Sequence, residues 1–369
     1  MARFTFPGVF GDEQLELRAV VRSFLAKNSA ETDVRRLMAT EEGFDRAIWR
    51  RAAVELGLQG LAVPEEYGGA GFGYQELGIV FEEMGRALFC GPYLATVALA
   101  AEALLRSDDP SAAKDLLPGI AAGTTVATLA LTDEGGAARA RPAAGGWAVT
   151  GTKMYVPDGH VADLVLVTAR TEVGPSLFAV ESAAPGLHRT VLPTVDQTRK
   201  QARLEFRDAP GRLVGVAGRA GQVLAPTLAT AGVLLAAEQV GGASKALELA
   251  VDYARLRVQY GHPIGAFQGI KHLCADVLAD LEAARSAVYD ALWSLAAGSA
   301  DLPIAAAVAQ ACGSEAYLRA ALDCVQVHGG IGFTWEHPAH LHVKRAKSSE
   351  VLLGTPAEHR ERIAVLLGL

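Results

Sequence analysis

The spacing of apolar side chains changes twice along the chain and divides it into three parts. Up to about residue 120, and again after about residue 225, apolar positions recur every three to four residues, as on one face of a helix. Between these parts, short runs such as residues 202–207 alternate apolar and charged residues, which is typical of half-buried strands. The pattern predicts an α+β protein with an N-terminal helical domain (1–120), a middle antiparallel β-sandwich or barrel domain (121–224) and a C-terminal four-helix-type bundle (225–369).

Within these parts the pattern places individual elements. Asp12 is expected to be the N-cap of a helix that runs to about Lys27, and the sequence Asp301-Leu-Pro is expected to start a long helix of the bundle. The Pro- and Gly-rich segment 63–73 should interrupt the helices. The other predicted helices cover 44–56, 74–87 and 92–106, and the predicted strands cover 126–132, 147–156, 163–169, 177–181 and 202–207.

Charge and composition exclude several classes of function. With 34 Lys and Arg against 41 Asp and Glu, the formal charge of −7 argues against a nucleic-acid partner. The N-terminal sequence predicts no signal peptide, and the longest apolar stretch noted, 94–105, is too short to span a membrane. Four scattered cysteines without a CxxC motif suggest free thiols in the cytoplasm. His337, His340 and His342 lack metal-ligand spacing and are expected to lie at a solvated helix start, so no metal site is predicted.

Two sequence runs carry more polar and glycine residues than packing requires. Residues 255–272, RLRVQYGHPIGAFQGIKH, join two predicted helices and bring Arg257, Tyr260 and Gln268 close together in sequence. Residues 326–333, QVHGGIGF, end another helix with three glycines, whose bare backbone N–H groups could approach a pyrophosphate. An Arg with an aromatic ring and Gln suits a phosphate and a stacked base, so both runs are candidates for anion binding, with helix capping as the alternative.

The chain resembles the acyl-CoA dehydrogenase family over nearly its whole length. The segments that carry the resemblance are VPEEYGGAGFG, GWAVTGTKMYV, ADLVLVTAR, the two runs above and LLGTPAEHR near the C-terminus. The resemblance implies the fold predicted above, FAD as the cofactor, an acyl-CoA substrate oxidised to the 2,3-enoyl-CoA, and electron-transfer flavoprotein as the acceptor. In that chemistry a glutamate removes the α proton while a hydride passes to the flavin.

The sequence departs from the family at both places where the glutamate base occurs. The position before the Gly-Thr of the closing segment holds Leu353, and the alternative position near the start of the first bundle helix holds Ala231. No catalytic residue is therefore assigned. Glu238, in an apolar stretch, and Glu350 are the candidates for a relocated base; the alternative is that Glu238 pairs with a neighbouring helix and Glu350 is solvated.

The FAD loops of the middle domain are also altered. Thr132 of the first loop is kept, but the family's Ser and Asp are absent after it, and no Trp follows Lys153 in the second. By contrast, the residues that resemble those reaching a neighbouring subunit's FAD are retained: Arg257, Tyr260, Gln268, Gln326, Gly329 and Gly330.

This asymmetry suggests one subunit of a heteromeric enzyme, an α2β2 tetramer in which the partner supplies the Glu base and the FAD is shared. It resembles the base-lacking chains of paired actinobacterial dehydrogenases that act on steroid side-chain thioesters. A self-sufficient homotetramer with a relocated base and a non-enzymatic acyl-CoA-binding scaffold are the alternatives.

Overall fold

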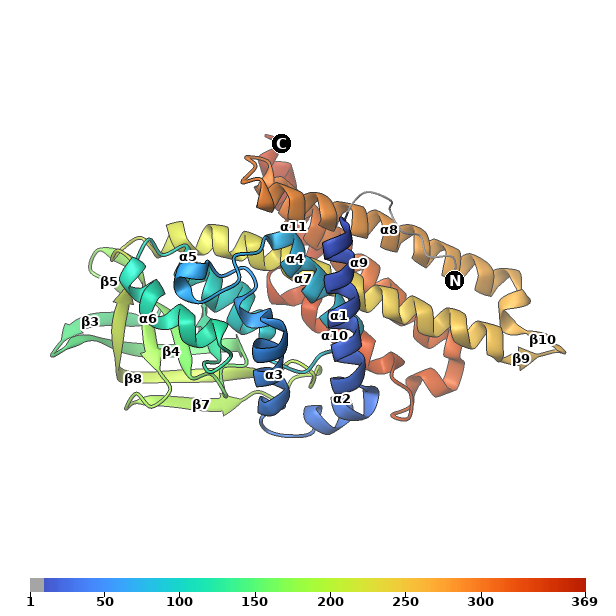
Figure 1. Ribbon diagram of the computed structural model, residues 1–369, viewed down its shortest axis with the longest axis horizontal. Coiled ribbons are helices and arrows are strands. Elements are labelled where there is room, and N and C mark those ends of the chain that lie inside the picture. Colours follow the sequence, from blue (N-terminus) through green and yellow to red (C-terminus); the bar gives the residue numbers. More distant parts are fainter. Residues whose placement is uncertain (1–9) are drawn as a thin grey trace.

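Three long helices, joined by short connections, form the C-terminal bundle (Figure 1). They are α7 (Ala220–Leu256), α8 (Gln268–Ala296) and α9 (Leu302–His328). Two shorter helices, α10 (Ala339–Leu352) and α11 (Pro356–Leu366), pack against α9. The computed structural model describes residues 10–369. The mutual packing of α7, α8 and α9 agrees with the bundle predicted from the helical period.

The N-terminal helices cover the bundle, chiefly through α4 (Tyr74–Arg86), which packs on α7 and α8. Two helices that the apolar pattern did not reveal are α2 (Glu31–Met38) and α6 (Pro110–Ala121); α6 begins at Asp109, whose carboxylate accepts a hydrogen bond from the Ala112 N–H. The predicted helix 92–106 is a π-helix, η3 (Leu94–Ala101), continued by α5 (Glu102–Leu105). The remaining elements are α1 (Asp12–Asn28), α3 (Arg46–Leu56) and the 3₁₀ turns η1 (Leu58–Gly60) and η2 (Glu65–Tyr67).

The β domain is one sheet that closes on itself, because β4 pairs with both β3 and β8 along the path β4-β3-β5-β6-β8. Its pairs are antiparallel except β1–β5 and β3–β5, within the part of the chain described. Alternation places Ala202, Leu204 and Phe206 inside, as predicted. The strands are β1 (Ala127–Ala130), β2 (Thr132–Asp133), β3 (Arg139–Ala143), β4 (Gly146–Pro157), β5 (Leu164–Thr171), β6 (Gly174–Glu181), β7 (Leu187–Val191) and β8 (Gln201–Val214).

Helix α7 corrects one prediction made from the sequence. This helix has 37 residues and is, by length and composition, able to cross a membrane. The sequence pattern instead places the longest apolar stretch at 94–105. The most apolar window of α7 is 61% buried inside the protein, between α4, α8 and α9. The apolar character of α7 therefore belongs to a core helix of the bundle.

Candidate functional site at the far end of the bundle

The two polar and glycine-rich runs meet at one end of the bundle. The first forms the hairpin β9 (Val258–Gln259) and β10 (His262–Pro263) between α7 and α8, and the second forms the 3₁₀ turn η5 (Gly329–Phe333) after α9. The ring of Tyr253, on the last turn of α7, stacks on His328 at a centroid distance of 4.4 Å. This contact places the end of α7, just before the first run, against the second run, at the end of α7 opposite the β domain (Figure 1).

The hairpin turn holds Tyr260 in an unusual conformation. Tyr260 and Gly261 have φ values of +50° and +79°, which match the two left-handed positions of a two-residue hairpin turn. Glycine adopts this conformation freely, whereas an aromatic residue is strained there. The Tyr260 side chain is 91% exposed and gains only an edge contact with Phe267. Because the strained backbone of Tyr260 is not offset by burial of its side chain in this chain, we infer that the ring contacts another molecule.

Arg257 and Gln268 flank this hairpin. The backbone N–H of Arg257 ends α7 by donating to the Tyr253 carbonyl at 2.8 Å, while its guanidinium makes no ion pair or hydrogen bond within residues 10–369. Gln268 is the first residue of α8 and is exposed. An unpaired guanidinium beside an exposed aromatic ring and an amide can bind a phosphate and a planar ring.

The glycines after α9 provide open space next to the backbone, but not an unpaired backbone N–H at Gly329. A Cβ atom on Gly329 or Gly330 would meet no atom within 4 Å, so a ligand can approach the backbone closely there. However, the Gly329 N–H already donates to the carbonyls of Val325 and Gln326, which corrects the expectation of bare N–H groups at this residue. Gln326 lies on the last turn of α9, exposed, next to this opening.

Apolar side chains surround these polar groups and face outward. Phe333 is 84% exposed and Leu256 is 79% exposed, on either side of the site. Contiguous apolar exposure of this kind is typical of an interface with another protein. The exposed members of the group are Leu256, Val258, Tyr260, Phe267, Ile331, Phe333 and Trp335.

Both positions where the family base occurs are packed against the core. Ala231 is fully buried on α7, and a side chain added at the neighbouring Gly232 would collide with the Gln310 amide, 1.9 Å from the added Cβ. Leu353 ends α10 and is partly buried against the same core. Neither residue can take up a proton, and a larger side chain at Ala231 would have to displace buried neighbours.

Glu238, the first candidate for a relocated base, lies at the centre of a buried ion network. Arg345 Nη1 on α10 is 2.8 Å from Glu238 Oε1, and Arg199 Nη2, just before β8, is 2.5 Å from Glu238 Oε2. Arg345 Nε is also 3.1 Å from Asp196 Oδ2, and Arg199 Nη1 donates to Ser349 at 3.1 Å. The expectation that Glu238 pairs with a neighbouring helix agrees with this contact to α10.

The network makes Glu238 a poor base. Burial alone would raise the pKa of this carboxyl, but the guanidinium groups of Arg199 and Arg345 hold the pKa below its ordinary value. A carboxylate whose oxygens are taken by two cations binds a proton weakly and is not free to approach a substrate. Glu350, the second candidate, accepts a hydrogen bond from Lys347 on the same face of α10.

The charges around Glu238 also include Asp158, at the end of β4. Burial raises its pKa to about 7, against the opposing effects of Arg199 and Arg345. Asp158 and Arg199 come from the β domain while Glu238 and Arg345 come from the bundle, so the network fills the junction between the two. Sequence reasoning did not identify Arg199, Arg345 or Asp196; the signal was Glu238 itself, because a glutamate in an apolar helix requires a buried cation.

The loop that resembles the family's flavin-binding loop, and that the altered sequence predicts not to hold a flavin ring in this chain, makes internal contacts. Asp133 Oδ1 is 2.7 Å from Lys153 Nζ, and it also accepts the Ala138 N–H. Lys153 is 1% exposed and donates to the Leu131 carbonyl and Thr168. Tyr155 stands beyond it at a bulge of β4, with φ of +56°, and is exposed. The polar groups of Asp133 and Lys153 are therefore satisfied within this chain, whereas the exposed groups at the far end of the bundle have the chemistry to bind a phosphate and a planar ring.

The histidine cluster and the four cysteines, the other groups that the sequence analysis considered, all lie within the described residues. Across residues 10–369 no group of three or more His, Cys, Asp or Glu side chains could hold a metal ion. His342 is buried rather than solvated, which corrects the placement expected for the histidine cluster, and Cys90, Cys274, Cys312 and Cys324 are free thiols.

Comparison with known proteins defines the family. Models of the acyl-CoA dehydrogenase N-terminal domain and C-terminal domain match residues 11–124 and 222–367. The chain therefore belongs to the acyl-CoA dehydrogenase family, flavin-dependent oxidoreductases that act on acyl-CoA and use FAD. This confirms the resemblance inferred from the sequence motifs and the fold predicted with it.

Three similar proteins cover nearly all of the chain. Acyl-CoA dehydrogenase IpdE2 of Mycobacterium tuberculosis is 36% identical over 354 residues, 95% of this chain and 96% of its own length. The structure of the ChsE4–ChsE5 complex from M. tuberculosis aligns with a TM-score of 0.89 at 31% identity, covering 97% of this chain and 98% of that one. The Tcur3481–Tcur3483 steroid ACAD aligns with a TM-score of 0.88 at 32% identity, with the same coverage.

Restoring a glutamate should not make the isolated chain active. We expect Leu353→Glu and Ala231→Glu to show no acyl-CoA-dependent dye reduction with added FAD, because a base is useless without a flavin facing the substrate within reach. Ala231→Glu should also destabilise the fold, since it buries an unpaired carboxylate. Dye reduction is measured with short- and long-chain acyl-CoA, using Leu353→Gln as the isosteric control. Activity of the Leu353→Glu chain above that control would contradict the prediction.

Proposed function

We propose that this chain is the non-catalytic subunit of a heteromeric acyl-CoA dehydrogenase, in which it completes the FAD site of a partner that carries the glutamate base. The observation that carries the proposal is the separation of two sets of residues. The groups suited to an FAD phosphate and base are exposed at the far end of α7, while the junction beside Ala231 and Leu353 is filled by charged side chains.

Two further features support assembly with a different subunit. The apolar side chains around Arg257 face outward, where a partner's β domain could cover them. Two of the similar structures are named for pairs of different chains, ChsE4 with ChsE5 and Tcur3481 with Tcur3483. An α2β2 tetramer is the assembly we propose by analogy with these pairs, with Arg257, Tyr260, Gln268, Gln326, Gly329 and Gly330 contacting the partner's FAD.

The substrate and the cellular setting follow from the same analogy. One of the similar structures is a steroid ACAD, so we propose the CoA thioester of a steroid side chain as the substrate class. Electron-transfer flavoprotein is the proposed acceptor. Four free thiols fit a reducing compartment, and we propose the cytoplasm.

The proposal is tested by the colour and mass of the purified chain. Expressed alone, it should be colourless and of ill-defined oligomeric state, because its own flavin loop is occupied and its apolar end is uncovered. Co-expressed with a family member that has Glu-Arg at the start of the corresponding helix, it should give a yellow complex of two chain types. Visible spectra and native mass spectrometry report both outcomes.

Two results would contradict the proposal. A stable, flavin-saturated and active homotetramer from the chain alone would show that it holds its own cofactor. Absence of flavin with every family partner tested would instead indicate a scaffold that takes no part in the chemistry.

A further inference from the structure

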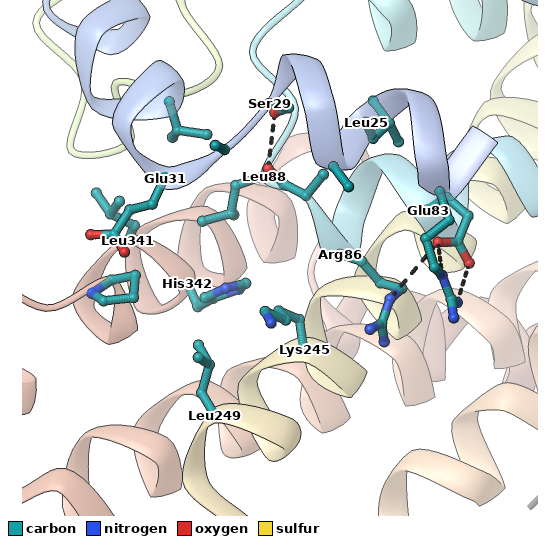
Figure 2. A pocket seen from close by; sticks show the side chains of 16 residues that line it. Leu25, Ser29, Glu31, Glu83, Arg86, Leu88, Lys245, Leu249, Leu341 and His342 are labelled. Carbon is teal, nitrogen blue, oxygen red and sulfur yellow. Dashed lines mark hydrogen bonds and ion pairs between the residues drawn. The ribbon is translucent and has the colours of Figure 1, made fainter. Parts of the chain in front are cut away.

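A cavity lies beside α7, close to the end of the bundle but lined by none of the residues proposed to contact FAD. Its volume is about 360 Å³, which is within the range of small-ligand sites. It opens between the end of α1, the start of α2, the end of α4, the middle of α7 and the start of α10 (Figure 2). Lys245 and Leu249 line it from α7, about three and two turns before Arg257 respectively.

The walls of the cavity are largely apolar and locally fixed. Leu25, Leu88, Leu249 and Leu341 contribute side chains from four different helices or helix ends. The α4 end is held in place by Ser29, whose hydroxyl donates to the Ala87 carbonyl at 3.1 Å. Leu88 follows with φ of +46°, a strained conformation for leucine that the surrounding packing maintains. These walls are suited to an apolar ligand body of limited length.

The charges lining the cavity are balanced except at one residue. Within residues 10–369, Lys245 makes no hydrogen bond or ion pair, although it is partly buried. The remaining charged groups have partners at 2.9 Å or less, so the cavity has one excess positive charge. Those pairs are Arg22 with Glu83, Arg86 with Glu248 and Glu31 with Arg35.

His342 supplies a second donor beside Lys245. The two side chains lie next to each other in Figure 2, and both line the cavity. His342 Nδ1 is 3.0 Å from the hydroxyl of the buried Tyr317, which has no other hydrogen-bond partner among the residues described. A buried hydroxyl must donate its hydrogen, so Nδ1 accepts it and Nε2 carries the imidazole hydrogen. Burial lowers the pKa of His342 to about 3, so the ring is neutral at pH 7.

We propose that this cavity binds a small carboxylic acid with an apolar body. The carboxylate would pair with Lys245 Nζ and accept from His342 Nε2, and the apolar body would lie against the four leucines. A cation, a neutral hydrogen-bond donor and apolar walls together are complementary to an apolar carboxylate. A neutral ligand would leave the charge of Lys245 without a partner. The inference does not rest on the proposed function, because it involves no FAD-binding residue and no partner.

Decanoate is a suitable probe, and the neutral decanamide is its matched control. Titration calorimetry on the full-length chain, alone or in the complex it forms, should show saturable binding of one decanoate per chain. Decanamide should bind at least about tenfold more weakly, which is the effect of a hydrogen-bonded charge pair. Lys245→Gln should weaken decanoate to a similar extent and leave decanamide unchanged.

Two more variants guard against trivial explanations. Lys114→Gln, on the exposed face of α6, removes a lysine outside the cavity and should leave decanoate binding intact. Leu249→Trp fills the cavity and should abolish binding of both probes. Equal binding of decanoate by Lys245→Gln and the unmodified chain would overturn the proposal. So would non-saturable binding or binding that Leu249→Trp does not affect.

Discussion

Arg345→Met should lower the free energy of unfolding by about 3–5 kcal/mol, the cost of removing one partner from a buried ion network. Arg345 is 3% exposed and contacts both carboxylates of the network, Glu238 at 2.8 Å and Asp196 at 3.1 Å. Methionine fills much of the same space but leaves Glu238 with Arg199 alone and Asp196 without an ion-pair partner among the residues described. Chemical denaturation monitored by circular dichroism measures the change.

A surface arginine provides the matched control. Arg319 on α9 also lies among carboxylates, those of Asp276, Asp280 and Asp323, but it is 45% exposed. Arg319→Met should therefore cost less than about 1 kcal/mol. A loss for Arg345→Met as small as that for Arg319→Met would show that the network does not stabilise the junction.

The same network predicts how stability depends on pH. Because the folded-state pKa of Glu238 lies below its ordinary value, its contribution is present above the ordinary carboxyl range and is lost as the pH falls through the folded pKa. Asp158 acts in the opposite sense, since its pKa is raised to about 7 and its ionisation opposes folding as the pH rises from about 4 to 7. Asp158→Asn should accordingly raise stability at pH 8, relative to the unmodified chain, and asparagine tolerates the φ of +51° found there.

Arg257→Ala should weaken FAD retention by the heteromeric enzyme about ten- to a hundredfold. A charge-assisted hydrogen bond to a phosphate contributes about 1.5–3 kcal/mol, and about 1.4 kcal/mol corresponds to a factor of ten. The exposed guanidinium has no partner in the described residues that would compete for it. FAD titration of the deflavinated complex measures the affinity, and excess FAD should restore most of the activity.

Arg255→Ala is the control for this experiment. Arg255 lies two residues earlier on α7, is 60% exposed and approaches only Asp252, at 4.0 Å. Its removal should leave FAD affinity unchanged. If Arg257→Ala also leaves the affinity unchanged and only lowers the melting temperature slightly, Arg257 is a helix-terminal charge and not an FAD ligand.

The elements that the sequence predicted are those with a long or regular pattern. The strand around Leu204 was recognisable because charged and apolar residues alternate, and α8 and α9 carry apolar residues through many turns. The short elements α2, β2, β3 and β7 have too few positions to show a period, and their conformation depends on neighbours distant in sequence.

The residues of the candidate sites also fall into two groups, those that the sequence motifs identify and those that only the folded chain reveals. Arg257, Tyr260 and the glycines lie in compact motifs, so their type and spacing identified them, and the structure adds that they are exposed at the same end of the bundle. The partners of Glu238 could not be found from spacing, because Arg199 and Arg345 are 39 and 107 residues away. Only the folded chain brings the β domain and α10 to the same carboxylate.

The buried network at the junction restricts the order in which this sequence could change over evolution. A glutamate acquired at position 231 would enter a filled core two helical turns from Glu238, where the existing carboxylates already match the available arginines. Such a substitution would bury an unpaired carboxylate, so it would be tolerated only after earlier changes in the surrounding core had supplied that carboxylate with a partner. Each of those earlier steps removes stability without any gain in activity, so the present state of the junction is difficult to reverse by single mutations.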